Sequence, residues 1–196
     1  IPADADKETG MSYSTNILIF KVTVTDAGNG VLNTAKTMVS GETEFVNAYE
    51  ADGELDIETT INPTKSLTGR DLTAGEFNFE LRQGGTLVQS ATNDAEGNIL
   101  FSPLVYTEED IDQTFSYTIV EIPGTEANMT YSEMTIDFTV LVEDAGDGVL
   151  SLTVNAPTDV IFFNVYTAPA PEPIPAPPVL NFDLGVVPSN VADCLE

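Results

Sequence analysis

Phe115-Ser-Tyr-Thr-Ile-Val-Glu121 alternates its apolar residues along the chain and ends on an acid where another apolar residue is due. Successive side chains of a β-strand point to opposite faces, so Glu121 shares a face with the Phe, Tyr and Ile of this stretch. Val160-Ile-Phe-Phe-Asn-Val-Tyr166 follows the same rule and places Asn164 between Phe and Tyr on its inward face. Both stretches predict strands that direct one polar side chain toward an apolar core.

A third polar side chain comes from upstream. The alternation of Leu55-Asp-Ile-Glu-Thr-Thr-Ile61, continued along the chain as extended backbone, places Lys65 on the inward face. A buried charge is costly unless it is paired or neutralised, so we expect an amine, a carboxyl and a carboxamide to meet in one core. There the Lys65 amine can attack the Asn164 carboxamide while Glu121 transfers protons and ammonia leaves. The product would be an isopeptide bond between Lys65 and Asn164.

Composition excludes several classes of function. The 196 residues allow one or two domains with packed cores, and 32 acidic against six basic residues give a net charge of −26. Nucleic acid is excluded as a partner because phosphate binding needs basic patches, and anionic membrane surfaces are disfavoured for the same reason. No membrane span is predicted in this chain.

The residue types present also limit the chemistry. Histidine is absent, which removes the ordinary Ser or Cys triad and the commonest metal ligand. Cys194 is the single cysteine, so no internal disulfide is possible. The Asp- and Gly-rich turns lack the ligand number and the closing glutamate of an EF-hand. We therefore expect no cofactor and no metal site.

An internal repeat sets the expected domain organisation. Residues 13–32 and 131–150 both begin with Tyr-Ser and both end with Asp-Ala-Gly, Asn or Asp, and Gly-Val-Leu. After a shift of one residue the repeat resumes downstream, and Asn47 aligns with Asn164. Too few residues precede Tyr13 to supply what precedes the second copy.

We accordingly predict three parts. Residues 1–50 form the C-terminal half of a β-sandwich domain, residues 51–167 form a complete domain, and residues 168–196 form a Pro-rich spacer and tail. The spacer, 168–178, is expected to be extended, and the apolar stretch 179–187 is expected to dock on a sheet edge as a strand.

Short strands at regular spacing predict an all-β fold, an antiparallel Ig-like β-sandwich with one complete domain preceded by a half domain. Thr107-Glu-Glu-Asp110 is expected to form one short turn, and no long amphipathic helix is predicted. Further strands are expected at 76–82, 86–91, 97–102 and 114–122.

Five motifs stand in order in the second part of the chain. They are Lys65-Ser-Leu-Thr-Gly-Arg-Asp-Leu-Thr-Ala-Gly-Glu-Phe-Asn-Phe-Glu-Leu81, Ala91-Thr-Asn-Asp-Ala-Glu-Gly-Asn-Ile-Leu-Phe101, Tyr106-Thr-Glu-Glu-Asp110, Tyr117-Thr-Ile-Val-Glu121 and Phe163-Asn-Val-Tyr166. This series resembles the isopeptide-bonded pilin domains of Gram-positive bacteria, of the streptococcal major-pilin type with Cna-B-like sandwiches. The resemblance covers residues 51–167 fully and 13–50 as a half domain.

The resemblance carries several implications. It implies Lys65 as the amine, Asn164 as the acceptor and Glu121 as the catalytic acid. It also implies a linear fibre of pilin subunits, joined by sortase and exposed at the cell wall of a Gram-positive bacterium. In that setting the chain would be a structural shaft subunit or stalk domain that reacts once, and not a turnover enzyme.

Alternatives remain open for each site residue. Lys65 could reach solvent along its stem, Glu80 could replace Glu121 as the acid, and Asn164 could bond backbone groups only. Phe-Asn-Phe-Glu80 alternates so that Glu80 faces away from the apolar residues, which favours Glu121.

Asn47 is a possible equivalent acceptor in the half domain. Lys7, Lys21 and Lys36 do not stand in a motif like the one that begins at Lys65. A missing strand, another molecule or the tail would therefore have to complete this half. The alternative function for the whole chain is an adhesin or binding module that recognises a host glycan or protein.

Overall fold

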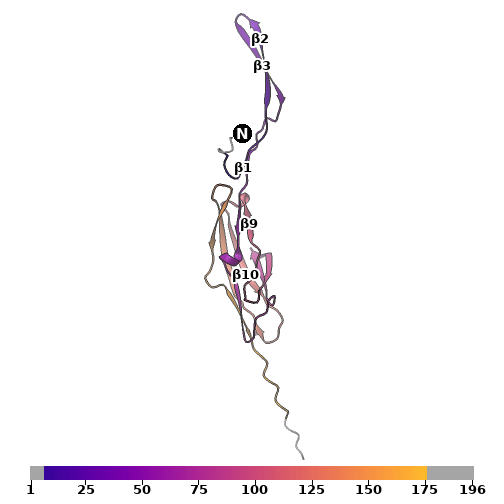
Figure 1. Ribbon diagram of the computed structural model, residues 1–196, viewed down its shortest axis with the longest axis vertical. Coiled ribbons are helices and arrows are strands. Elements are labelled where there is room, and N and C mark those ends of the chain that lie inside the picture. Colours follow the sequence, from indigo (N-terminus) through magenta and orange to yellow (C-terminus); the bar gives the residue numbers. More distant parts are fainter. Residues whose placement is uncertain (1–6, 176–196) are drawn as a thin grey trace, which may run out of the picture.

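The computed structural model describes residues 7–175 as an elongated molecule, with a β-hairpin at one end and the chain leaving the sandwich at the other (Figure 1). The predicted strand at 179–187 and Cys194 lie outside the described residues. We call residues 7–50 the half unit and residues 51–167 the second unit.

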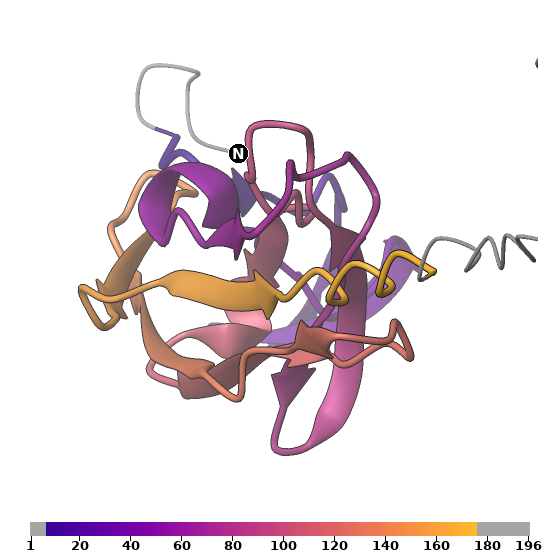
Figure 2. The ribbon, with the colours of Figure 1, turned by 90° about the horizontal axis from the view of Figure 1, so that it is seen from below.

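The second unit is a β-sandwich, as predicted. One sheet has five antiparallel strands in the order β13-β12-β10-β7-β8, and the opposite layer contains the sheet β11-β14-β6 and the pair β5-β9 (Figure 2). Its strands are β5 (Asp52–Leu55), β6 (Thr64–Thr68), β7 (Asn78–Gln83), β8 (Thr86–Thr92), β9 (Leu104–Thr107), β10 (Thr114–Ile122), β11 (Met129–Thr130), β12 (Thr135–Asp144), β13 (Leu150–Asn155) and β14 (Ile161–Tyr166).

One strand pair departs from the antiparallel rule. β14 and β6 run parallel, with Phe162 opposite Lys65 and Asn164 opposite Leu67. Strands in parallel need a long connection, and here it comprises almost the whole unit. Lys65 and Asn164 therefore lie two positions apart on neighbouring strands, close to the start and the end of the second unit.

The core between the layers is aromatic and aliphatic. Phe79 of β7 and Phe162 of β14 meet across it with ring centroids 5.2 Å apart. Tyr117 and Phe138, on neighbouring strands of the five-stranded sheet, stack at 5.2 Å. The alternating burial of β10 and β12 follows the alternation of their sequences, because one face of each strand packs on this core.

Two expectations about local structure are wrong. The segment 55–61 is not extended: Asp56 caps a one-turn helix, α1 (Ile57–Thr60), by accepting hydrogen bonds from the backbone N–H of Glu58 and Thr59. The segment 97–102 is not a strand, since it joins its neighbours only through isolated bridges at Asn98 and Ile99. The expected turn at 107–110 is confirmed as a capped 3-10 helix, η2 (Glu108–Asp110).

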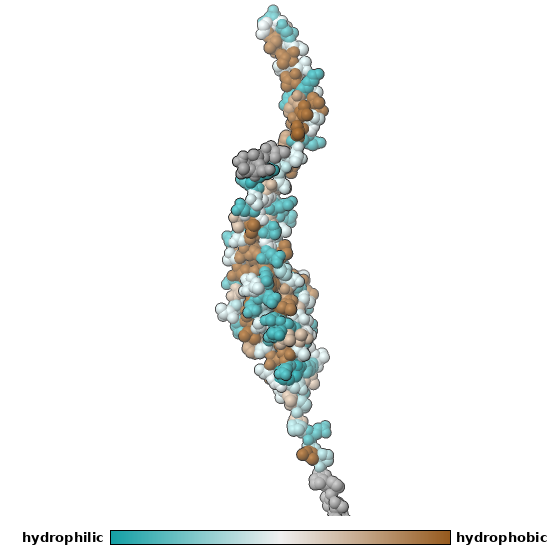
Figure 3. Space-filling model, in the orientation of Figure 1, coloured by the Kyte–Doolittle hydropathy of each residue, from teal (hydrophilic) through white to brown (hydrophobic). Residues whose placement is uncertain are grey.

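The half unit reproduces part of the second unit. A hairpin of β2 (Ile19–Gly28) and β3 (Val31–Ser40) matches the pair β12 and β13. β1 (Met11–Ser12) pairs with β4 (Ala48–Tyr49) as β11 pairs with β14. Both hairpin turns are held alike, by an Asp carboxylate that accepts from the backbone N–H two residues on. The hairpin projects away from the sandwich, and apolar side chains run along it (Figure 3).

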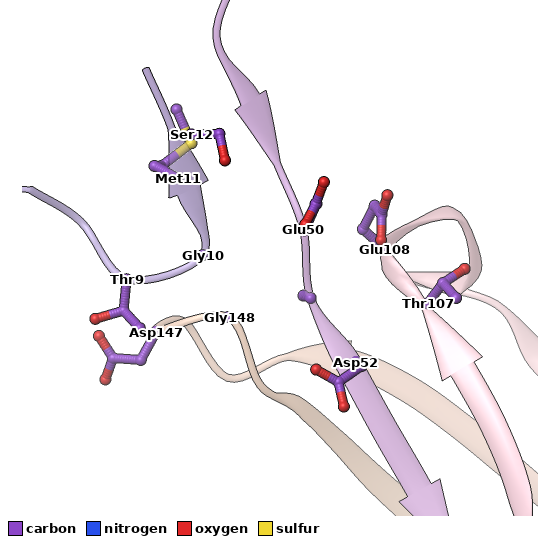
Figure 4. Close-up of a pocket in the computed structure, with 11 residues that line it drawn as sticks. Thr9, Gly10, Met11, Ser12, Glu50, Asp52, Thr107, Glu108, Asp147 and Gly148 are labelled. Atoms are coloured by element: carbon purple, nitrogen blue, oxygen red, sulfur yellow. The ribbon is translucent and has the colours of Figure 1, made fainter.

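The two units meet through their backbones. Gly10 and Gly148 both have positive φ, and a Cβ on Gly10 would lie 2.8 Å from the Gly148 Cα. The Tyr49 hydroxyl also donates to Asp144 at 2.8 Å, and this hydrogen bond raises the pKa of the Tyr49 hydroxyl. A hollow of about 620 Å³ lies beside this joint and is lined by acidic and hydroxyl side chains (Figure 4).

Candidate functional site: a lysine, an acid and an asparagine between the sheets

Lys65 reaches the core because β6 is held on both sides. β14 lies on one side in parallel register, and on the other side the Lys65 N–H donates to the Gly97 carbonyl at 2.7 Å. Gly97 has φ +95, and a Cβ there would lie 2.3 Å from the Lys65 carbonyl oxygen. This close approach requires glycine, because only glycine adopts such a φ readily and leaves the space free.

Glu121 comes from the opposite sheet. It lies near the end of β10, opposite Phe79 of β7, and its side chain enters the core from the five-stranded sheet. Lys65 and Asn164 enter from the other layer. The side chains of Lys65 and Glu121 are both 0 % exposed, so the alternative in which Lys65 reaches solvent is wrong.

The Glu121 carboxylate joins the other two side chains. Lys65 Nζ donates to Glu121 Oε2 at 2.9 Å, and Asn164 Nδ2 donates to Glu121 Oε1 at 2.6 Å. Each carboxylate oxygen thus contacts one of the two nitrogens that an isopeptide reaction exchanges. The free-energy cost of burying the two charges is reduced because the lysine and the glutamate form a hydrogen-bonded pair.

The electrostatic setting acts on the lysine in two directions. Burial lowers the pKa of the Lys65 amine from its ordinary value, while the hydrogen bond and the charge of Glu121 oppose that shift. The ammonium also lies 4.5 Å from the centroid of the Phe77 ring. The net effect favours the neutral, nucleophilic amine relative to a lysine in water.

A backbone group completes the site. The N–H of Ser132, just after β11, donates to Asn164 Oδ1 at 2.7 Å. This bond fixes the orientation of the carboxamide, because the N–H requires an oxygen and the carboxylate requires the amide nitrogen. Asn164 therefore bonds the backbone, as one alternative held, but it contacts Glu121 as well.

Glu80 is not part of this cluster. Its carboxylate accepts from the guanidinium of Arg82, on the other face of β7, as the alternation of the sequence indicated. The sequence did not reveal the contributions of Ser132 and Gly97. The signal for Ser132 was present in the repeat, where Tyr-Ser precedes both hairpins, but a backbone donor has no side chain that would mark it.

Asn47 stands in a similar local setting without the other two groups. The Ser14 N–H donates to Asn47 Oδ1 at 3.0 Å, the counterpart of the Ser132 bond. The Asn47 side chain is exposed, and residues 7–50 contain no counterpart of β6 or β10. The structure therefore brings Lys65, Glu121 and Asn164 together and leaves Asn47 apart from them.

The acidic side chains of residues 7–175 do not form a metal site. No group of three or more His, Cys, Asp or Glu residues there is arranged to hold a metal ion. Within the same residues, no helix has the length and the apolarity to cross a bilayer. The acidic hollow at the joint lies at the end of the sandwich, among residues of the half unit and the loops that meet it.

The comparisons with known proteins point to one family. The family model of the Spy0128-like isopeptide containing domain matches residues 4–50 and 61–167. The first range contains the half unit, and the second contains Lys65, Glu121 and Asn164. A search of the curated proteins finds no match.

Proposed function

The chain belongs to the family of Spy0128-like isopeptide containing domains, and on this basis we propose that it is a structural shaft subunit or stalk domain of a bacterial pilus, stabilised by an autocatalytic bond between Lys65 and Asn164. The observation that carries the proposal is the pair of hydrogen bonds to Glu121, one from each reacting nitrogen. This arrangement suits one internal reaction, since the reactants are parts of the core itself.

The reaction begins with a proton transfer. The Lys65 ammonium gives one proton to Glu121 Oε2 along the 2.9 Å hydrogen bond, which leaves a neutral amine and a carboxylic acid. The amine nitrogen then forms a bond to the Asn164 Cγ, and the electron pair of the C=O moves to Oδ1. The Ser132 N–H, 2.7 Å from Oδ1, stabilises the negative charge that develops there.

Glu121 then exchanges protons between the two nitrogens. Glu121 gives the proton that it took from Lys65 to Asn164 Nδ2, and the resulting carboxylate takes one from the attacking nitrogen. The C–Nδ2 bond breaks, ammonia leaves, and the carbonyl re-forms as a secondary amide. Glu121 ends protonated, so five protons on the two nitrogens at the start are accounted for by the amide, the ammonia and the acid. The reaction consumes its own substrate and therefore occurs once in each molecule.

We further propose a three-part division of the chain and its assembly into a fibre. The division into residues 1–50, 51–167 and 168–196 is supported by the two separate ranges that the family model matches. A bond from β6 to β14 would close a long loop and so oppose extension of the subunit under load. Neighbouring pilin subunits, joined head to tail by sortase at the surface of a Gram-positive cell, are the expected partners, without nucleic acid, membrane or cofactor.

Intact mass under denaturing conditions tests the reaction. The purified chain should weigh one ammonia less than its sequence, and peptide mapping should join Lys65 to Asn164. Glu121→Gln keeps a similar shape but cannot take the lysine proton, so it should fold and retain the full sequence mass. Glu80→Gln is the matched control and should still lose ammonia. A full mass for the unmodified chain would contradict the proposal.

A further inference from the structure

Asn93 is a buried polar side chain that takes no part in the reaction described above. It is 2 % exposed and directly follows β8. Its Oδ1 accepts from the Phe77 N–H at 2.9 Å, and its Nδ2 donates to the carbonyls of Thr73 and Asp94, both at 2.8 Å. The whole carboxamide is thus bonded to backbone groups, and it fixes the segment before β7 to the segment after β8.

Both segments that Asn93 joins contact Lys65. The Phe77 ring is 3 % exposed, and its centroid lies 4.5 Å from Lys65 Nζ. The Gly97 carbonyl, in the segment after β8, accepts from the Lys65 N–H at 2.7 Å. The turn to Gly97 is closed by its own N–H, which donates to the Asp94 carbonyl at 3.3 Å. The amine and the backbone of Lys65 are therefore both held by groups that lie next to Asn93.

The position of the Phe77 ring bears on the reaction at three points. The ring occupies space beside the amine that water would otherwise fill, and burial is the largest cause of the lowered pKa of Lys65. Its face attracts the ammonium, which helps to fix the place of Nζ before the proton transfer. Phe77 also meets Tyr131 edge to face, with ring centroids 6.2 Å apart, and Tyr131 directly precedes the backbone donor Ser132. A displaced Phe77 would therefore disturb the surroundings of the nucleophile and of the acceptor together.

Resting on the proposed function, we propose that Asn93 is a positioning residue for the crosslinking reaction. It holds the Phe77 ring beside the Lys65 amine, and the ring holds the amine where it meets Glu121. Its own hydrogen bonds go to backbone groups, so it acts through Phe77 and not on the reacting atoms. A misplacement of the reacting groups by about 1 Å can slow a reaction of this kind by about 10²-fold.

The rate of ammonia loss during refolding tests the role of Asn93. Asn93→Ala should react about 10²-fold more slowly than the unsubstituted chain. Tyr106→Phe is the matched control, because it also removes a buried hydrogen bond, the one from the Tyr106 hydroxyl to the Tyr117 hydroxyl at 3.1 Å, and it should react at the normal rate. Urea unfolding of both changes in the uncrosslinked Asn164→Ala chain compares their costs in stability. An Asn93→Ala chain that folds and reacts at the normal rate would overturn the inference.

A double-mutant cycle tests whether the effect passes through Phe77. Phe77→Leu should slow the reaction by a factor similar to that of Asn93→Ala, since each removes the ring from its place beside the amine. The chain that carries both changes should react no more slowly than the slower single variant, because two steps of one route are not additive. If the two factors multiply instead, Asn93 does not act through Phe77 and the inference is wrong.

The contact itself can be measured by NMR in Asn164→Ala, where the Lys65 amine stays free. A nuclear Overhauser effect between the Phe77 ring and the Lys65 ε-methylene group should be present there, unchanged by Tyr106→Phe and lost with Asn93→Ala.

The isosteric Asn93→Asp keeps an acceptor for the Phe77 N–H and takes the place of Asn93→Ala if that variant does not fold. In every folded variant at position 93, contact and rate should be kept or lost together, and a change in only one of them would overturn the inference. An unsubstituted chain that loses no ammonia, while Asn164→Ala shows the contact, would instead contradict the Lys65–Asn164 reaction. The two failures are therefore distinguishable.

Discussion

Phe20 in the half unit and Phe138 in the second unit occupy equivalent places in two copies of one hairpin, yet Phe20 is 40 % exposed and Phe138 only 2 %. The two hairpins share their turn, their register of pairing and the bond from serine N–H to asparagine. Local sequence is therefore sufficient for the strands and turns, but burial depends on what residues 51–123 add. In the second unit, Lys65, Glu121 and Asn164 form a cluster of three reactive groups, whereas in the half unit the Asn47 carboxamide stands apart from such a cluster.

The largest difference between the two units should appear when the asparagine of each is replaced by alanine. Asn164→Ala should abolish the crosslink and, for a closed loop of about 100 residues, lower the free energy of unfolding of the second unit by about 4–5 kcal/mol. Asn47→Ala should leave both the mass loss and that free energy unchanged. Denaturant unfolding with intact-mass analysis measures both, and equal effects of the two variants would contradict the asymmetry between the units.

Removing the backbone donor to Asn164 should have the next largest effect, which falls on the rate of crosslinking. Ser132→Pro removes the N–H that contacts Asn164 Oδ1 and should slow crosslinking by about 10²–10³-fold. Ser132→Ala keeps the N–H and should react at a nearly normal rate. Ser14→Pro, the matched change in the half unit, should leave the reaction unaffected. The measurement is the time course of ammonia loss during refolding, with circular dichroism to establish that each variant folds.

A smaller effect is expected from an isosteric change on the two hairpins. Val140→Thr buries a hydroxyl in a fully enclosed position and should cost the second unit about 1–3 kcal/mol. Val22→Thr places the hydroxyl at an exposed position and should change stability by less than about 0.5 kcal/mol. Thermal unfolding of both variants decides the matter, and a similar cost at Val22 would mean that its face is already covered.

The smallest effect is a dependence on pH. In Asn164→Ala the Lys65 amine stays free, and its pKa is lower in the folded state than the ordinary 10.5. Between those two values the unfolded chain binds more protons than the folded one, so stability should rise with pH. Asn164→Ala combined with Lys65→Met should lack this rise. Urea midpoints measured on both variants across the alkaline range test the sign.

Much of the fold followed from alternation in the sequence. The stretch 114–122 forms β10 as predicted, and the inward phase of Glu121 and Asn164 matches their places in the core. The β-sandwich class was confirmed because each of these strands packs one face only, which leaves a clear period of two.

Other features depended on information that a single stretch does not carry. Residues 57–60 contain β-compatible residues, yet the Asp56 cap and packing of Ile57 in the core favour one turn of helix. The parallel pairing of β6 with β14 joins strands almost 100 residues apart, which periodicity cannot indicate. The role of Ser132 rests on a backbone N–H, which every residue except proline has.

The contact of Gly10 with Gly148 has a mechanical consequence. Backbone approaches backbone there, beside the hydrogen bond from Tyr49 to Asp144, so the angle at which one unit meets the next depends on the close approach of two main chains. An alanine at Gly10 would act as a wedge of fixed size, because its Cβ would lie 2.8 Å from the Gly148 Cα and equally close to the Glu50 carbonyl oxygen. In a linear array, a small rotation at every joint accumulates into curvature and twist. The straightness of a rod built from such units would thus depend on glycine being present at positions 10 and 148.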